Sequence, residues 1–177
     1  MKHSILWWQT AGFIFTAIAG TLLHFVFDWT NGSVVAAVFS AVNESIWEHL
    51  KLIFYPMVIF ALVQYRFVGN QYEAFWCIKL RGILLGLLLI PVIYYVYTGV
   101  LGVSADWFNV LIFFLAAAAV YRWETIQFQN GTVCRLSPSV SVFLLLLISL
   151  LFTLLTFYPP EIPFFRDPVT GTYGFQC

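Results

Sequence analysis

Residues 34–68, VVAAVFSAVNESIWEHLKLIFYPMVIFALVQYRFV, decide how this chain folds. Two apolar runs flank a polar stretch in this segment. A single helix from Val34 to Tyr65 would be about 48 Å long, whereas the hydrocarbon core of a bilayer is about 30 Å thick. We therefore expect a broken or re-entrant helix near residues 34–51, with the span itself over residues 43–68 and polar in its first turns.

The rest of the chain is equally apolar. Hydrophobic residues make up 62% of the 177 residues and charged residues only 9%, whereas soluble domains carry about a quarter. A bilayer tolerates only helices or closed barrels, and the apolar runs lack the alternation of barrel strands. The sequence predicts an all-α, polytopic transmembrane helical bundle of about five spans in one domain, residues 1–177. The other spans are expected at residues 5–27, 82–103, 107–127 and 138–158, followed by a tail at residues 159–177.

The distribution of lysine and arginine predicts the orientation. With five spans and the N-terminus inside, six of these residues lie on the inner side and two on the outer side, which fits the positive-inside rule. We expect a multi-pass protein of the cell membrane with a cytoplasmic N-terminus and an extracytoplasmic C-terminal tail. The inner residues are Lys2, Arg66, Lys79, Arg81, Arg122 and Arg135, and the outer residues are Lys51 and Arg166.

Partners follow from the same composition. The bilayer is the first of them, and a net charge of zero without a basic run gives no basis for nucleic-acid binding. Gly82 and Gly86, four apart, predict close helix packing, either within the chain or between copies in a homo-oligomer. The three cysteines, Cys77, Cys134 and Cys177, are scattered and odd in number, so we expect no disulfide framework.

Polar residues gather at the outer ends of the first two spans. His24 and Asp28 are four apart, as are Glu44 and Glu48, and His49 follows directly. Imidazole with carboxylates is a ligand set for zinc, manganese or iron, so His24, Asp28, Glu48 and His49 are candidate metal ligands. With an open metal position, Glu44 or Glu48 is a candidate catalytic base. The spacing matches no established metal motif.

Each of these residues also has a purely structural interpretation. Glu44 and Glu48 are acceptable in the first turns of a helix because the macrodipole favours acids there, and Lys51 could then pair with Glu48. His24 in an apolar span is more often hydrogen-bonded to a neighbouring helix than bound to a metal. Only the convergence of these groups on one side favours the functional interpretation.

The tail is rich in aromatic and turn-forming residues, FFRDPVTGTYG at residues 164–174. One hypothesis is a lid across the outer mouth of the bundle, in which Arg166 meets Glu44, Glu48 or Asp28. Asn43, Lys51 and Asp167 would complete the pocket or lid. The alternative is an interfacial strap held by its aromatic residues. Those residues are Phe164, Phe165 and Tyr173.

The segments VNESIWEHLK, residues 42–51, and FRDPVTGTYG, residues 165–174, resemble a family of small bacterial membrane proteins known only as a domain of unknown function. The resemblance covers nearly the whole chain. It implies a bacterial cytoplasmic membrane and a helical integral fold, and it brings no activity or catalytic residue.

Three functions remain open from the sequence. The first is an outward-facing pocket that binds a divalent metal, takes a lipid or small-molecule ligand, and supports hydrolysis of a lipid or envelope substrate at the outer face. The second is a small ion-coupled transporter or solute-binding subunit, because buried carboxylates and broken helices build such sites. The third is an accessory or scaffold protein whose polar cluster docks a partner membrane subunit.

Overall fold

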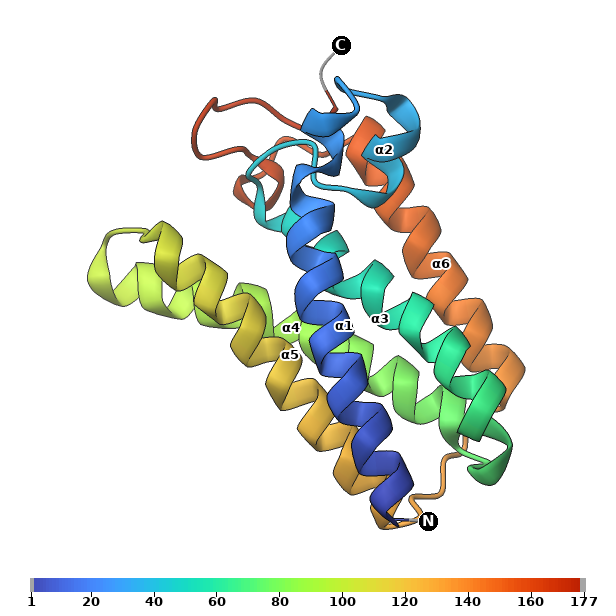
Figure 1. Cartoon of the computed structure of the whole chain (residues 1–177). Helices are drawn as coiled ribbons and strands as arrows, with labels where there is room; N and C mark the ends of the chain where they lie inside the picture. Colours follow the sequence, from blue (N-terminus) through green and yellow to red (C-terminus); the bar gives the residue numbers. More distant parts are fainter. Residues whose placement is uncertain (1, 176–177) are drawn as a thin grey trace.

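The computed structural model describes residues 2–175, which form an all-helical bundle with 77% helix and no strand (Figure 1). Five helices are long and apolar enough to cross a membrane, so the predicted helical multi-pass bundle is confirmed. They are α1 (Lys2–Trp29), α3 (Ile46–Val68), α4 (Phe75–Leu101), α5 (Asp106–Gln129) and α6 (Pro138–Phe157). The short elements are α2 (Val34–Phe39) and the 3₁₀ turns η1 (Gly69–Gln71) and η2 (Pro163–Phe165).

Helix α3 is the centre of the bundle. Its most apolar window is 61% buried within the protein, against 17–33% for the other four spans, whose remaining surface is left for lipid. Helix α1 packs against α3 and α5, and α6 packs against α4 and α2. The α4–α5 hairpin diverges from α1 as it approaches the turn that joins α4 to α5 (Figure 1). The tail and α2 both lie at the end of the bundle where α1 stops and α3 starts, which we call the histidine end.

The break near residues 34–51 consists of α2 and a bend of six residues. The Ser40 hydroxyl, at the end of α2, accepts a hydrogen bond from the Phe27 N–H at 3.0 Å, which holds the bend against α1. Helix α3 begins at Ile46 because Ser45 caps it, its hydroxyl accepting from the Glu48 N–H. The helix therefore starts three residues later than the predicted span, and Glu44 lies in the bend.

Helix α4 starts earlier than the predicted span at residue 82. It begins at Phe75, so Lys79 is inside the helix and buried rather than in a connecting loop. Gly82 and Gly86 face α5 and α3 of the same chain, since added Cβ atoms would meet Glu124, Val120 and Ile53.

One disulfide is present, although the number and scatter of the cysteines predict no disulfide framework. Cys77 in α4 is bonded to Cys134 in the loop after α5, with the two Cα atoms 6.3 Å apart. The two residues are 57 positions apart, so no local spacing pattern predicts the bond. The pairing depends on the α4–α5 hairpin, which brings the start of one helix to the end of the other.

Glycine allows α1 to approach the centre of the bundle. A Cβ atom at Gly20 would lie 2.5 Å from the Leu52 carbonyl oxygen and 2.6 Å from the Phe113 ring. That carbonyl cannot receive its usual helical hydrogen bond, because Pro56, four residues on, has no N–H to donate. Position 20 of α1 must therefore lack a side chain, because the backbone oxygen that it faces has little freedom to move.

We expect Gly20→Ala to lower the free energy of unfolding by about 1–3 kcal/mol, the usual cost of overpacking. Thermal unfolding of the detergent-solubilised protein measures this loss. Gly99→Ala is the matched control, because a Cβ there would have no atom within 4 Å. Equal unfolding temperatures for the two variants would contradict this account of α1 packing.

Candidate metal centre

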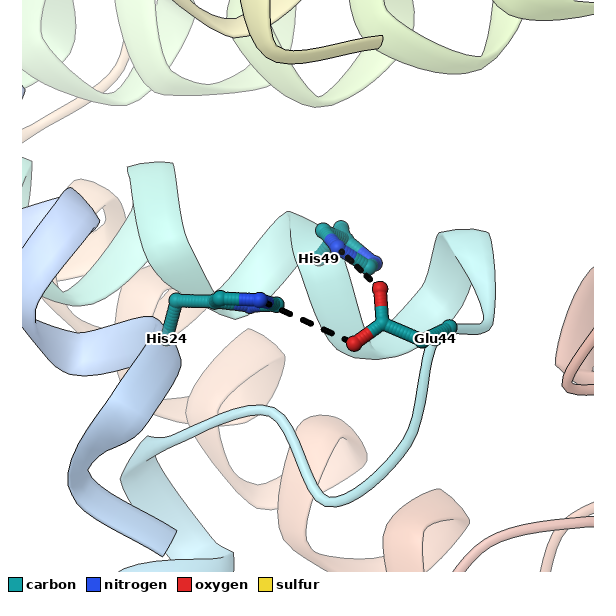
Figure 2. Close-up of side chains that lie close together, drawn as sticks. All are labelled: His24, Glu44 and His49. Carbon is teal, nitrogen blue, oxygen red and sulfur yellow. Dashed lines mark ion pairs between the residues drawn. The ribbon is translucent and has the colours of Figure 1, made fainter. Parts of the chain in front are cut away.

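Three side chains from separate segments meet at the histidine end. His24 comes from α1, Glu44 from the bend and His49 from the first turn of α3 (Figure 2). His24 Nε2 lies 3.6 Å from Glu44 Oε1, and His49 Nε2 lies 3.4 Å from Glu44 Oε2. One ligand atom from each residue lies within 4.8 Å of the others, so a single ion could contact all three.

The orientation of His49 determines which of its ring atoms faces Glu44. His49 Nδ1 is 2.9 Å from the Ser45 carbonyl oxygen, which can only accept, so Nδ1 carries the hydrogen. In the neutral ring Nε2 is then a bare acceptor. It faces a carboxylate oxygen, which is also an acceptor, at 3.4 Å. Two acceptors at that distance repel unless a proton or a cation lies between them.

His24 completes the cluster from the opposite side. Its ring centroid is 5.3 Å from that of His49, and its Nε2 faces the other Glu44 oxygen. Within residues 2–175 its buried Nδ1 atom has no hydrogen-bond partner. The side chains of His24, Glu44 and His49 are 28%, 48% and 33% exposed, so the cluster is open to small molecules and water.

The local charges favour an ionised Glu44. The hydrogen bond with the His49 side chain lowers the pKa of Glu44 from its ordinary value, and burial opposes this shift less strongly. The two imidazoles add to the lowering through their charge. An ionised carboxylate is the form that binds a metal ion.

Glu48 does not join this cluster. It is paired with Lys51, whose Nζ lies 2.5 Å from Glu48 Oε2, and both side chains are at most 1% exposed. Thr156 on α6 donates to Glu48 Oε1 at 2.8 Å and accepts from Lys51 at 3.1 Å. Lys51 also donates to the Ala37 carbonyl of α2 at 2.8 Å. The geometry of Glu48 is therefore that of a buried structural ion pair joining α2, α3 and α6.

The other predicted site residues surround the cluster without belonging to it. Asp28 is exposed, one helical turn beyond His24, and close enough to act on it electrostatically. Asn43 donates from Nδ2 to the Gly174 carbonyl at 3.1 Å, so it binds the tail. The ion pairs among residues 2–175 include none between Arg166 and an outer acid, and Arg166 is exposed beside Gly171.

Asp167 links the tail to the bend. Its carboxylate accepts from the Val169 N–H at 2.7 Å and from the Thr170 hydroxyl at 2.8 Å, and it also accepts from the Glu44 backbone. Burial opposes ionisation of Asp167, but these hydrogen bonds outweigh it and hold the pKa below its ordinary value. The tail therefore contacts the backbone of the residue that sits between the two histidines.

Aromatic rings hold the tail in place. The Trp47 ring centroid is 4.8 Å from that of Phe165 and 6.0 Å from that of Phe164. The Phe175 N–H donates to the Thr156 carbonyl at 2.8 Å. These contacts give the tail the anchoring expected of a strap, and they bring it within reach of the cluster as a lid would require.

The sequence interpretation missed a second group of buried polar residues. Lys79 was expected on the inner side outside the spans, and Glu124, Gln9 and Gln64 were not singled out, yet all four are buried. A signal was available for Lys79. It recurs with Gly82 and Gly86 at the three- and four-residue spacing of one helix face, so a span extended back to Phe75 would place it on the packed face.

Comparison with known proteins places the chain in a family. No curated protein and no solved structure matches it. Residues 2–175 match the family model described as a family of unknown function, DUF6512, so the match covers nearly the whole chain. The chain therefore belongs to the family of unknown function DUF6512.

Proposed function

We propose that this membrane protein binds a divalent transition-metal ion through His24, Glu44 and His49. The observation that supports the proposal most directly is the convergence of two imidazole nitrogens on one carboxylate, with His49 Nε2 3.4 Å from Glu44 Oε2 and His24 Nε2 3.6 Å from Glu44 Oε1. A metal ion bound by all three side chains would replace the proton that His49 and Glu44 otherwise share. The hydrogen bond from His49 Nδ1 to a backbone carbonyl is also the outer-shell contact that orients metal-bound histidines.

The donor set limits the metal. Two imidazoles and one carboxylate suit zinc, manganese or iron, and three protein ligands leave a position for water or substrate, as in catalytic zinc sites. A metal there would lower the pKa of a bound water and supply a nucleophile. We infer a metal-dependent hydrolase that acts on a lipid or another substrate at the extracytoplasmic surface. Glu44 is then a ligand, and exposed Asp28 is the carboxylate left to act as base.

Metal content of the purified protein tests the proposal. We expect near-stoichiometric metal in the wild type after loading with zinc and dialysis, and at least a tenfold loss of bound metal in Glu44→Gln or His49→Ala, because each removes one of three ligands. Plasma mass spectrometry gives the metal-to-protein ratio. His3→Ala and Glu161→Gln are matched controls, since His3 lies about six turns from His24 on α1 and Glu161 is exposed.

Two results would contradict the proposal: a wild type that retains no metal after loading, or control variants that lose as much metal as the ligand variants. The first result would favour the scaffold interpretation if the ligand variants also lost a co-purifying membrane subunit. Ion-dependent uptake into proteoliposomes would instead favour a transporter. Gel filtration of each variant shows whether a loss of metal follows from misfolding.

A further inference from the structure

A second polar cluster lies inside the bundle at the end opposite the histidines. Four helices contribute one polar side chain each, and all four are at least 98% buried. In a span that contacts lipid, such residues are expensive unless they are paired or hydrated. The residues are Gln9 (α1), Gln64 (α3), Lys79 (α4) and Glu124 (α5).

The helix register brings these side chains to one level. Added Cβ atoms would meet Phe60 at Gly12 and Leu52 at Gly20, so α1 and α3 run antiparallel in a register that puts Gln64 at the level of Trp8 and Gln9. The Trp8 ring, stacked 5.3 Å from Phe67, agrees with this register. Gln9 in turn lies near the Glu124 carboxylate on α5, but the two side chains are not in hydrogen-bond geometry.

Lys79 and Glu124 form an ion pair inside this cluster. Lys79 Nζ is 2.6 Å from Glu124 Oε2, and three aromatic rings lie 5.3–5.9 Å from the ammonium group. Lys79 on α4 is the charged group that faces Glu124, and Gln9 on α1 is the amide near it. The pair is therefore neutral overall, but it is enclosed by rings and apolar side chains. The three rings belong to Phe75, Tyr121 and Phe128.

Several donor and acceptor atoms in the cluster lack a hydrogen-bond partner. Among the described residues, both amide atoms of Gln9, both of Gln64 and Oε1 of Glu124 are buried without a partner. A buried polar group without a hydrogen bond is destabilising, so five of them would consume a large part of the stability of a domain. The missing partner must both donate and accept, because amide N–H groups and oxygens are unpaired together.

We propose that Gln9, Gln64 and Glu124 form a binding site for internal water next to the Lys79–Glu124 ion pair. Water is the small ligand that donates and accepts at once, and buried waters make about three hydrogen bonds each to groups of this kind. The bound water solvates Glu124 Oε1, the oxygen that Lys79 does not reach. The ion pair thus remains hydrated inside the membrane-spanning bundle, and the two amides are the residues that hold the water.

Infrared difference spectroscopy in H₂¹⁶O and H₂¹⁸O tests the site in liposomes. The wild type shows a narrow water-stretching band that shifts in H₂¹⁸O, and Gln9→Leu/Gln64→Leu loses it. The matched control is Gln71→Leu/Gln129→Leu, which replaces two exposed glutamines and keeps the band. A wild type without an ¹⁸O-sensitive band, or a band that persists in Gln9→Leu/Gln64→Leu, overturns the proposal.

A second measurement needs only the wild type. Hydroxyl radicals generated by X-rays from bound water label the nearest side chains, so Tyr121 and Phe128 become labelled while Phe54, equally buried elsewhere, does not. Labelling of none of these rings, or of all three equally, counts against the water site. We expect the metal content of Gln9→Leu/Gln64→Leu to stay at the wild-type level, so the water site and the metal site are tested independently.

Discussion

Lys51→Met is expected to lower the free energy of unfolding by about 3–5 kcal/mol, the cost of leaving one member of a buried ion pair without its partner. Glu48 would keep the Thr156 and Val42 hydrogen bonds but lose the ammonium group 2.5 Å away. Lys51 also anchors α2 through the Ala37 carbonyl, so the same change loosens the bend. Denaturant or thermal unfolding in detergent measures the loss.

The double variant separates the charge from the packing. Glu48→Leu/Lys51→Met removes both charges and keeps similar volumes, so it should recover most of the stability lost by Lys51→Met alone. Arg166→Met, which removes an exposed cation at the same end, should change the free energy of unfolding by less than about 0.5 kcal/mol. A loss below about 1 kcal/mol for Lys51→Met would show that the pair is not the structural link described above.

Phe165→Ala is expected to release the tail and cost about 3–5 kcal/mol, the usual effect of truncating a buried phenylalanine. Phe165 is 6% exposed and packs on Trp47, which immediately precedes Glu48 in the first turn of α3. Limited proteolysis should then cleave within residues 159–175 of the variant, under conditions in which the wild-type tail resists. Phe143→Ala, on the exposed face of α6, is the matched control and should leave the tail protected.

The same variant links the tail to the proposed metal centre. Asp167 accepts a hydrogen bond from the Glu44 backbone and Asn43 donates to Gly174, so the docked tail holds the bend that carries Glu44. Loss of such outer contacts usually weakens metal binding by about 10- to 100-fold, and we expect zinc affinity to fall by that amount in Phe165→Ala. Unchanged zinc affinity with a released tail would reject the lid hypothesis and leave only a strap.

Much of the fold follows from the sequence because hydrophobic length and capping are local properties. Ser137 and Pro138 predict the start of α6, because a serine cap followed by proline is typical of the first residues of a helix. The structure confirms this start: Pro138 is the first helical residue, and the Ser137 hydroxyl accepts from the Val140 N–H. The break near residues 34–51 follows from a comparison of helix length with bilayer thickness. Neither inference needs any knowledge of what packs against the segment.

The candidate site could be predicted only in part. His24, Glu44 and His49 were all among the residues expected there, but Glu44 and Glu48 were treated as neighbours on one helix face. That rule holds only inside a helix, and Ser45 caps α3 one residue after Glu44. As a result Glu44 faces the two histidines, while Glu48 faces Lys51 and Thr156.

The sequence by itself determined that this is a helical membrane protein with a polar end, because lipid solvation acts on each residue almost independently of its neighbours. Only the tertiary structure decided which polar groups meet. Lys79 reaches Glu124, and Cys77 reaches Cys134, through the rotation and register of α4 against α5. Rotation and register come from close side-chain packing between segments distant in sequence, and hydropathy carries no information about that packing.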